Sequence, residues 1–224
     1  MGTIDLSKLT GLSGRIGPIV TYITKGGKQA FRVYVKPNNP RSPKQVEHRA
    51  KFALVNRALS PLNNVIKRGY RHDKNAYRTL ISKAFREAVT GDYPHFSVDF
   101  SKIQIAVGKL QLPADIRLRF DRLSGMATFS WNPHLAWPSQ PGSDNDRVHI
   151  VYFNTGNPLE VKTFSRGTRA DSEASVELSG ERQPDITHFW IYFTSHDLQD
   201  NSNSIYLACD PPSDANNPTN VTKT

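Results

Sequence analysis

Apolar and polar residues alternate with a period of two near the start of the chain. Residues 16–24 and 28–35 both show this pattern, which is typical of a half-buried β-strand. Between them, Lys25-Gly26-Gly27 is typical of a tight turn, because glycine accepts the positive φ of hairpin turns. The second run places Phe31, Val33 and Val35 on one face, opposite Arg32 and Tyr34. We predict a β-hairpin that packs on helices or on a neighbouring subunit, because an isolated hairpin is marginal in water.

The period changes to 3.6 after residues 36–43, a segment that three prolines hold extended. Ser42 followed by Pro43 is a helix start, and we predict a helix from Pro43 to about Leu59. Two shorter helices are predicted at residues 61–68 and 74–89. The expected packing face of the first helix consists of Val46, Ala50, Phe52 and Ala53. The two shorter helices are expected to end at Gly69 and Gly91, respectively.

A period of two returns after residue 94. Residues 96–100 and 103–107 alternate, and seven further short runs follow, separated by turn-forming residues. The seven predicted strands are residues 116–120, 126–131, 148–153, 161–164, 175–178, 188–194 and 205–207. This series is typical of an immunoglobulin or fibronectin III β-sandwich. The single cysteine, Cys209, excludes an internal disulfide and favours the fibronectin-like variant, whose expected core aromatics are Phe129, Trp131 and Trp190.

We therefore predict an α+β protein with an N-terminal β-hairpin plus helices and a C-terminal all-β immunoglobulin/fibronectin III-like sandwich. Residues 1–94 are expected to form a basic assembly region, residues 95–210 the sandwich domain, and residues 211–224 a flexible tail rich in Pro, Asn, Asp and Thr. No apolar run approaches the roughly 20 residues of a membrane helix. The first residues lack a basic region followed by an apolar core, so no secretion signal is expected.

The charge is unevenly distributed. The net charge is +9, yet residues 1–90 contain 18 Lys and Arg against four Asp and Glu, whereas residues 91–224 contain 11 against 16. A basic half attracts polyanions or acidic protein surfaces; alternatively, the two halves complement each other within one chain or between copies. The candidate partner-binding residues are Arg32, Tyr34, Lys36, Arg41, Lys44, Arg49, Lys51, Arg57, Arg68, Tyr70 and Arg71. Arginine with tyrosine suits a protein interface and equally suits phosphate binding and base stacking.

The residues that would carry enzymatic chemistry do not form a recognisable set. The seven histidines are scattered, and no nucleophile elbow or phosphate-binding glycine loop occurs. A glycosidase-type carboxylate pair could be sought among Asp144, Asp146, Asp171 and Asp185, although ordinary surface acids explain these residues better. We expect no enzyme activity, no catalytic or metal-binding residue, no cofactor and no small-molecule substrate.

Several motifs resemble those of a bacterial family of unknown function. They are the glycine-rich start at residues 11–17, the Lys25-Gly26-Gly27-Lys28 turn, Asn39-Pro40-Arg41-Ser42-Pro43 before the first helix, Gly91-Asp92-Tyr93-Pro94, and Ser202-Asn203-Ser204-Ile205-Tyr206-Leu207. Ser42 stands where the family usually has Thr, and it preserves the helix cap. Similar segments occur in proteins of phages and prophage-like elements. The resemblance implies a structural protein of a virion or mobile element, located in the virion or the cytoplasm, but no activity or catalytic residue.

Our hypothesis is a non-enzymatic structural or assembly protein. Its basic N-terminal half would dock onto other structural subunits or onto further copies of itself, with no membrane involved. The alternative is a nucleic-acid-binding protein that uses the same basic face.

Overall fold

The computed structural model describes residues 12–39, 41–121, 124–135, 140–157, 161–178 and 187–208. The chain divides into two compact units, Met1–Pro43 and Lys44–Thr224. The helices, which we grouped with the hairpin in residues 1–94, thus share a unit with the sandwich, because their apolar side chains pack on one of its sheets. The tail expected at residues 211–224 lies outside the described residues.

The first unit contains a small antiparallel sheet with the strand order β1-β2-β3. The strands are β1 (Gly14–Ile16), β2 (Ile19–Ile23) and β3 (Gln29–Val33). β2 and β3 form the predicted hairpin, and Gly27 has the positive φ of 74° that its turn requires. The sequence pattern missed β1, a strand of only three residues.

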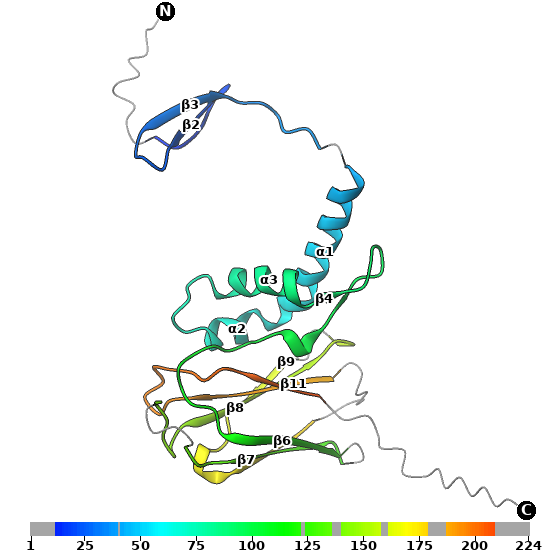
Figure 1. Cartoon of the computed structure of the whole chain (residues 1–224), viewed down its shortest axis with the longest axis vertical. Coiled ribbons are helices and arrows are strands. Elements are labelled where there is room, and N and C mark those ends of the chain that lie inside the picture. Colours follow the sequence, from blue (N-terminus) through cyan, green and yellow to red (C-terminus); the bar gives the residue numbers. More distant parts are fainter. Residues whose placement is uncertain are drawn as a thin grey trace, which may run out of the picture. The chain divides into compact units, whose positions relative to one another are not determined.

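The second unit contains the predicted β-sandwich, whose seven strands form two antiparallel sheets (Figure 1). The three-stranded sheet has the order β10-β7-β6 and the four-stranded sheet the order β12-β11-β8-β9. The strands are β6 (Ala114–Asp121), β7 (Met126–Asn132), β8 (Arg147–Asn154), β9 (Val161–Phe164), β10 (Glu173–Glu177), β11 (Thr187–Thr194) and β12 (Ile205–Ala208). The first, second and fifth strands thus face the third, fourth, sixth and seventh, which is an immunoglobulin-like topology. All seven predicted strands are confirmed.

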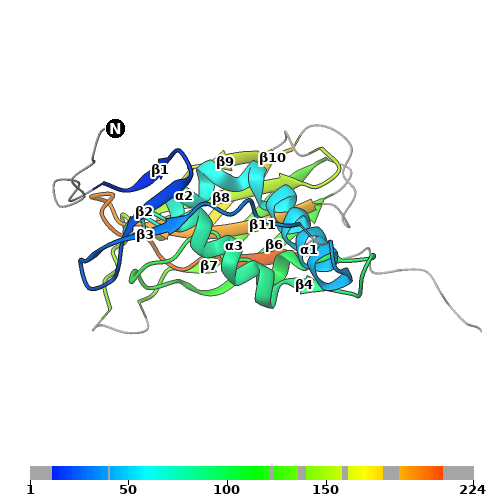
Figure 2. The same ribbon diagram turned by 90° about the horizontal axis from the view of Figure 1, so that it is seen from above.

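A helical layer covers the other face of the four-stranded sheet (Figures 1 and 2). It consists of α1 (Pro43–Leu59), a 3-10 turn η2 (Ser60–Leu62), α2 (Asn63–Gly69) and α3 (Ala76–Glu87). In β11, Trp190 and Tyr192 pack toward the helices, whereas Phe189 and Ile191 pack toward the three-stranded sheet. β8 alternates in the same way, so the two central strands, β8 and β11, are buried on both faces.

One expectation about packing is wrong. Val46, Ala50, Phe52 and Ala53 do not form the buried face of α1, where the buried residues are Val55 and Leu59 near its C-terminus. Trp190 is a fully buried core aromatic, as expected, but it belongs to the helix-side core, and its indole N–H donates to the Ile103 carbonyl at 2.8 Å. Phe129 and Trp131 do lie in the core between the sheets.

The connection between helices and sandwich is less regular than the sequence pattern predicts. α3 ends at Glu87, and Gly91, with φ of 82°, lies instead in the turn between the two short strands β4 (Val89–Thr90) and β5 (Ser97–Val98). Phe100–Lys102 is a 3-10 turn, η3. Residues 103–107, predicted as a strand, pair with no strand, although Ile103 and Ile105 are buried.

α2 approaches the rest of the unit closely at its C-terminal glycine. A Cβ atom placed on Gly69 would lie 2.1 Å from the Ile105 carbonyl oxygen and 2.9 Å from the Ala106 Cβ. The backbone N–H of Val107 donates to the Gly69 carbonyl at 3.1 Å. Gly69 thus fixes the position of α2 over the segment that leads into the sandwich.

A buried ion pair closes one end of the sandwich. Arg169, in the 3-10 turn η4 (Arg169–Asp171), is fully buried, and its Nη2 lies 3.1 Å from Asp146 Oδ2. Its guanidinium also donates to the Gln111 carbonyl, while the Arg169 carbonyl accepts from the Trp131 indole at 2.8 Å. Asp146 is only 1% exposed, so our interpretation of it as an ordinary surface acid is wrong.

Candidate partner-binding surface

The β1-β2-β3 sheet has one face made largely of exposed apolar side chains. Because cross-strand partners point to the same side of a sheet, the register aligns Ile16, Ile19 and Val33 in one row and places Phe31 and Ile23 on the same side. We call these five residues the apolar face. Val33 is 71% exposed and Ile16 55% exposed. Exposed apolar clusters are frequent where proteins contact other molecules, so the apolar face is a candidate partner-binding surface.

The opposite face of the same sheet is basic and aromatic. Arg15, Tyr22 and Arg32 alternate with the apolar face along their strands. The Arg15 guanidinium carbon lies 3.7 Å from the centroid of the Tyr34 ring, within the range of a cation–π interaction. Residues 12–39 contain five Lys and Arg and no Asp or Glu. The sheet thus combines an apolar face with a face whose charged side chains are all cationic.

The predicted residues of this unit lie in solvent. Arg32, Tyr34, Lys36 and Arg41 are all exposed. The sequence pattern assigned Phe31, Val33 and Val35 to one face and Arg32 and Tyr34 to the other, and the register confirms this alternation for Phe31, Arg32 and Val33. It did not indicate that Ile16 and Ile19 extend the apolar face, because these residues require the pairing of β1 with β2.

The predicted residues of α1 also lie on an accessible surface. Lys44, Arg49 and Arg57 are exposed and Lys51 is half-buried. The Lys51 amino group lies 4.8 Å from the centroid of the Phe85 ring in α3, and His48 and Phe52 lie against the same ring, with centroids at 4.8 and 6.5 Å. Residues 43–88 contain 11 Lys and Arg against three Asp and Glu. The helical layer is therefore a second cationic surface.

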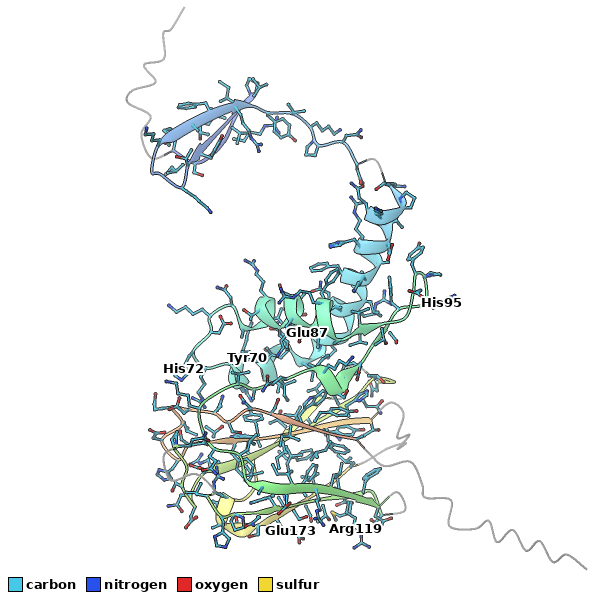
Figure 3. The ribbon with its side chains drawn as sticks, in the orientation of Figure 1. Tyr70, His72, Glu87, His95, Arg119 and Glu173 are labelled. Atoms are coloured by element: carbon cyan, nitrogen blue, oxygen red, sulfur yellow. The ribbon has the colours of Figure 1, made fainter. Side chains whose placement is uncertain are left out.

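Tyr70 occupies a different environment from the other candidate residues. It lies half-buried after α2, against the helix-side core (Figure 3), and its hydroxyl donates to the Gln104 carbonyl at 2.7 Å. Burial, with a smaller contribution from the nearby Asp73 carboxylate, raises the pKa of Tyr70 to about 12. Tyr70 therefore anchors α2 to residues 103–107.

Arg68 and Arg71 lie near a third arginine that the sequence did not single out. Arg147 begins β8, and His149, two residues later, is subject to the positive charge of all three guanidinium groups. Burial first, and these three charges second, lower the pKa of His149 to about 4. No sequence signal could join them, since they come from positions about 80 residues apart.

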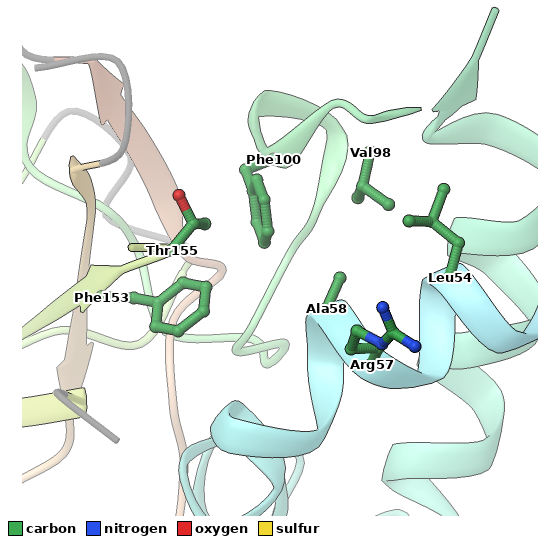
Figure 4. A pocket seen from close by; sticks show the side chains of 7 residues that line it. All are labelled: Leu54, Arg57, Ala58, Val98, Phe100, Phe153 and Thr155. Atoms are coloured by element: carbon green, nitrogen blue, oxygen red, sulfur yellow. The ribbon is translucent and has the colours of Figure 1, made fainter. Parts of the chain in front are cut away.

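A small apolar pocket lies within the second unit, between α1 and the end of β8 (Figure 4). Its volume is about 220 Å³, and Arg57 is the charged residue among the described side chains that line it. The other lining residues are Leu54, Ala58, Val98, Phe100, Phe153 and Thr155. The volume is below the roughly 300–1,000 Å³ of typical ligand sites, and suits a single apolar side chain.

The outer face of the three-stranded sheet has mixed charge. Arg119 on β6 and Glu173 on β10 mark this face in Figure 3, and both line a polar hollow with Asp121 and Thr128. Paired charges of both signs favour neither a polyanion nor a polycation. The strongly cationic surfaces are thus the first unit and the helical layer.

Within the part of the chain that the structure describes, no group of three or more His, Cys, Asp or Glu side chains could hold a metal ion. None of the helices described is long and apolar enough to cross a membrane.

The fold and surfaces define an α+β protein in which an immunoglobulin-like sandwich has a basic helical layer and is joined to a small, exposed sheet. The chain belongs to a family of unknown function, DUF6266, whose profile matches residues 11–208. The resemblance to a family of unknown function is thereby confirmed over nearly the whole chain.

Several solved structures also match part of the chain. The fibronectin type III domain of human contactin 1 is 14% identical in sequence; the match covers 47% of this chain and 85% of that chain, with a TM-score of 0.27. No curated protein matches the chain.

Proposed function

We propose that this protein is a non-enzymatic structural or assembly protein that docks onto another subunit through its β1-β2-β3 sheet. The observation that supports this proposal is the apolar face, on which Ile16, Ile19, Ile23, Phe31 and Val33 are each at least 42% exposed. A three-stranded sheet gains stability when its hydrophobic face is covered. Burial of apolar area contributes about 25 cal/mol per Å², so covering this face favours both docking and the order of the sheet.

The charge of the first unit specifies the partner surface further. With five cationic side chains and no acidic one in residues 12–39, the sheet repels a basic partner and attracts an acidic one. The partner that fits is therefore a structural subunit with an apolar patch flanked by carboxylates.

We propose that the assembly is a phage virion or a particle of a related mobile element. Support comes from the resemblance of Asn39-Pro40-Arg41-Ser42-Pro43 to segments of phage and prophage proteins. The protein would then be located in the virion, or in the cytoplasm before assembly.

The basic helical layer supports a second candidate function, nucleic-acid binding. Residues 43–88 have 11 Lys and Arg against three acids, and phosphate contacts of such side chains make affinity fall steeply with salt, by about 0.9 in log–log slope for each contact with duplex DNA. Docking through an apolar face has a weaker salt dependence, which separates the two candidates.

The test of docking is purification of particles from the source, followed by mass spectrometry for this chain and its copy number. A triple variant, Ile19→Thr, Ile23→Thr and Val33→Thr, keeps β-branched side chains and β-propensity while making the face polar. We expect it to co-purify with particles at least tenfold less than the unmodified chain. Val107→Thr, at an apolar position in the second unit that is 39% exposed, is the matched control and should co-purify normally.

Two results would overturn the proposal. One is absence of the chain from particles; the other is equal co-purification of the triple variant and the control. Binding to DNA with a steep salt slope, unaffected by the triple variant, would support the second candidate instead.

A further inference from the structure

Three arginines of the second unit lie close enough to His149 for their charges to act on it: Arg68 at the end of α2, Arg71 just after it, and Arg147 at the start of β8. Arg71 Nε lies 3.4 Å from the Asn201 side-chain oxygen, and the Asn201 amide donates to the carbonyls of Arg68 and Gly69 at 2.9 Å each. The same Asn201 oxygen accepts from the Thr194 hydroxyl at 2.8 Å. Thr194 pairs with Arg147 across the β8–β11 ladder. Asn201 therefore joins the end of α2 to Thr194 of β11, the cross-strand partner of Arg147.

A histidine with an unsatisfied nitrogen lies on the same face of the sheet. His149 follows Arg147 by two residues, so both side chains share the helix-facing side, and its ring stacks on Tyr192 with centroids 4.9 Å apart and planes 15° apart. Its Nδ1 lies 2.7 Å from the Ser165 hydroxyl oxygen. Its Nε2 is buried and has no hydrogen-bond partner. A buried polar atom without a partner costs about 1–3 kcal/mol.

The positive charge of this cluster has no acidic counterpart among the described residues. Arg68, Arg71 and Arg147 form no ion pair there; the nearby carboxylates of Asp146 and Asp200 bond to Arg169 and His72 respectively. Burial and the three guanidinium charges lower the pKa of His149 to about 4, so its ring is neutral at pH 7. When the Ser165 hydroxyl donates to Nδ1, Nε2 carries the ring proton and becomes a hydrogen-bond donor.

We propose that Arg68, Arg71, Arg147, Ser165 and His149 form a binding site for a phosphate group. Guanidinium groups offer several N–H donors in a fixed plane and match phosphate oxygens bidentately. A phosphate group has enough oxygens to accept from several guanidinium groups at once. One further oxygen supplies the acceptor that His149 lacks once the groups that cover its buried Nε2 move aside. The site lies wholly in the second unit and shares no residue with the apolar face. The phosphate-site proposal can therefore be refuted without affecting the docking proposal.

The site can be tested on the full chain by ¹⁵N NMR of the histidine rings. Inorganic phosphate is titrated at constant ionic strength, with chloride as the compensating anion, and the His149 ring signals are followed. We expect a saturable shift at His149 that is absent in the chloride titration. A second titration uses an oligothymidylate of eight nucleotides. Tighter binding of the oligonucleotide assigns the site to a nucleic-acid backbone, whereas binding of inorganic phosphate alone assigns it to a free phosphate group or phosphomonoester.

Matched variants distinguish specific phosphate binding at this site from nonspecific electrostatic attraction of phosphate to the basic surface. Arg147→Gln removes one charge from the cluster and should weaken phosphate binding at least tenfold. Arg78→Gln removes the same charge from an exposed position of α3 and should change binding less than twofold. Near-UV circular dichroism of both variants shows that the fold is retained; if Arg147→Gln is unfolded, Arg68→Gln takes its place. The proposal is wrong if His149 does not respond to tens of millimolar phosphate, or if both variants weaken binding equally.

Discussion

His188 is a half-buried base on the helix-facing side of β11. Its ring lies 4.3 Å from the Phe100 ring centroid, and its Nδ1 lies 2.9 Å from the Tyr206 hydroxyl oxygen. Burial lowers the pKa of His188 to about 4. The folded chain thus holds this ring neutral at a pH where the unfolded chain, with a pKa near 6.5, takes up a proton.

This difference predicts a pH-dependent stability. Between about pH 6.5 and pH 4 the unfolded state binds more protons, so the free energy of unfolding should fall as the pH is lowered. The uptake of one proton on unfolding changes the free energy of unfolding by at most about 1.4 kcal/mol per pH unit. His188→Gln should therefore reduce the pH dependence of the free energy of unfolding by about 1 kcal/mol per pH unit in this window. Urea unfolding at several pH values measures the slope. His72→Gln, at a mostly exposed position, is the control, and an equal effect there would contradict the prediction.

The Arg169–Asp146 pair is the other residue-scale determinant of stability. Removal of one partner leaves the other charge buried without compensation, which costs about 3–5 kcal/mol. Asp146→Asn should therefore lower the free energy of unfolding by several kcal/mol in urea titrations. The double variant Arg169→Met, Asp146→Leu should recover much of this loss, because it buries no charge. A double variant less stable than Asp146→Asn would contradict this account.

The sequence could not predict this ion pair. Charged residues are almost never fully buried, so Asp146 in a turn-rich segment was expected at the surface. Its burial depends on Arg169, which the Gln111 carbonyl and the Trp131 indole hold in place from positions far apart in the chain.

At the scale of elements, the position of α2 depends on Gly69. Glycine to alanine in an exposed helix stabilises by up to about 1 kcal/mol, but here the new Cβ would lie 2.1 Å from the Ile105 carbonyl oxygen. Gly69→Ala should therefore destabilise the second unit by about 3 kcal/mol, since close packing leaves no room. Thermal unfolding measures the loss. Lys67→Ala, exposed on the same helix, should change stability by less than about 0.5 kcal/mol.

The strands were more predictable than the segments between them. The seven strands of the sandwich alternate clearly, and turn formers bound each one. Residues 103–107 alternate too, yet their polar groups are satisfied without a sheet: the Ile103 carbonyl accepts from Trp190, the Gln104 carbonyl from Tyr70, and the Ala106 carbonyl from the Ser204 backbone. Periodicity cannot distinguish a strand from an extended segment whose partners are side chains.

The buried face of α1 was missed for a related reason. The helix has apolar residues on more than one side, and only its C-terminal part, with Val55 and Leu59, is buried in the core. For the candidate surface, the alternation in residues 28–35 predicted the two faces of β3, but the full width of the apolar face depends on β1 pairing.

At the scale of the whole molecule, the helices and the sandwich are predicted to fold together. The four-stranded sheet carries Val151, Phe153, Trp190 and Tyr192 on its helix-facing side, and a chain without the helices would expose them. A fragment that begins at residue 95 should lack cooperative unfolding and bind the dye ANS, whereas a fragment that begins at Lys44 should unfold cooperatively. Urea titration followed by tryptophan fluorescence compares them. Equal cooperativity of both fragments would contradict the prediction.

Composition and periodicity placed the domain boundary near residue 94 because the charge balance and the period both change there. The true division follows contacts, which composition does not record: residues 44–88 differ from the sandwich in charge and period but share its core.

The central strands of the four-stranded sheet are covered by the helices on one face and by the three-stranded sheet on the other. This arrangement limits where genes for related proteins can recombine. An exchange within the stretch that encodes residues 60–110 would pair helices from one parent with strands from another, and the side chains of the two would have to match. An exchange within residues 34–42, where the backbone forms no helix or strand in the described positions, would replace the β1-β2-β3 sheet and leave the core of the second unit unchanged. We therefore expect chimeras between relatives to remain soluble when they are joined in this short stretch.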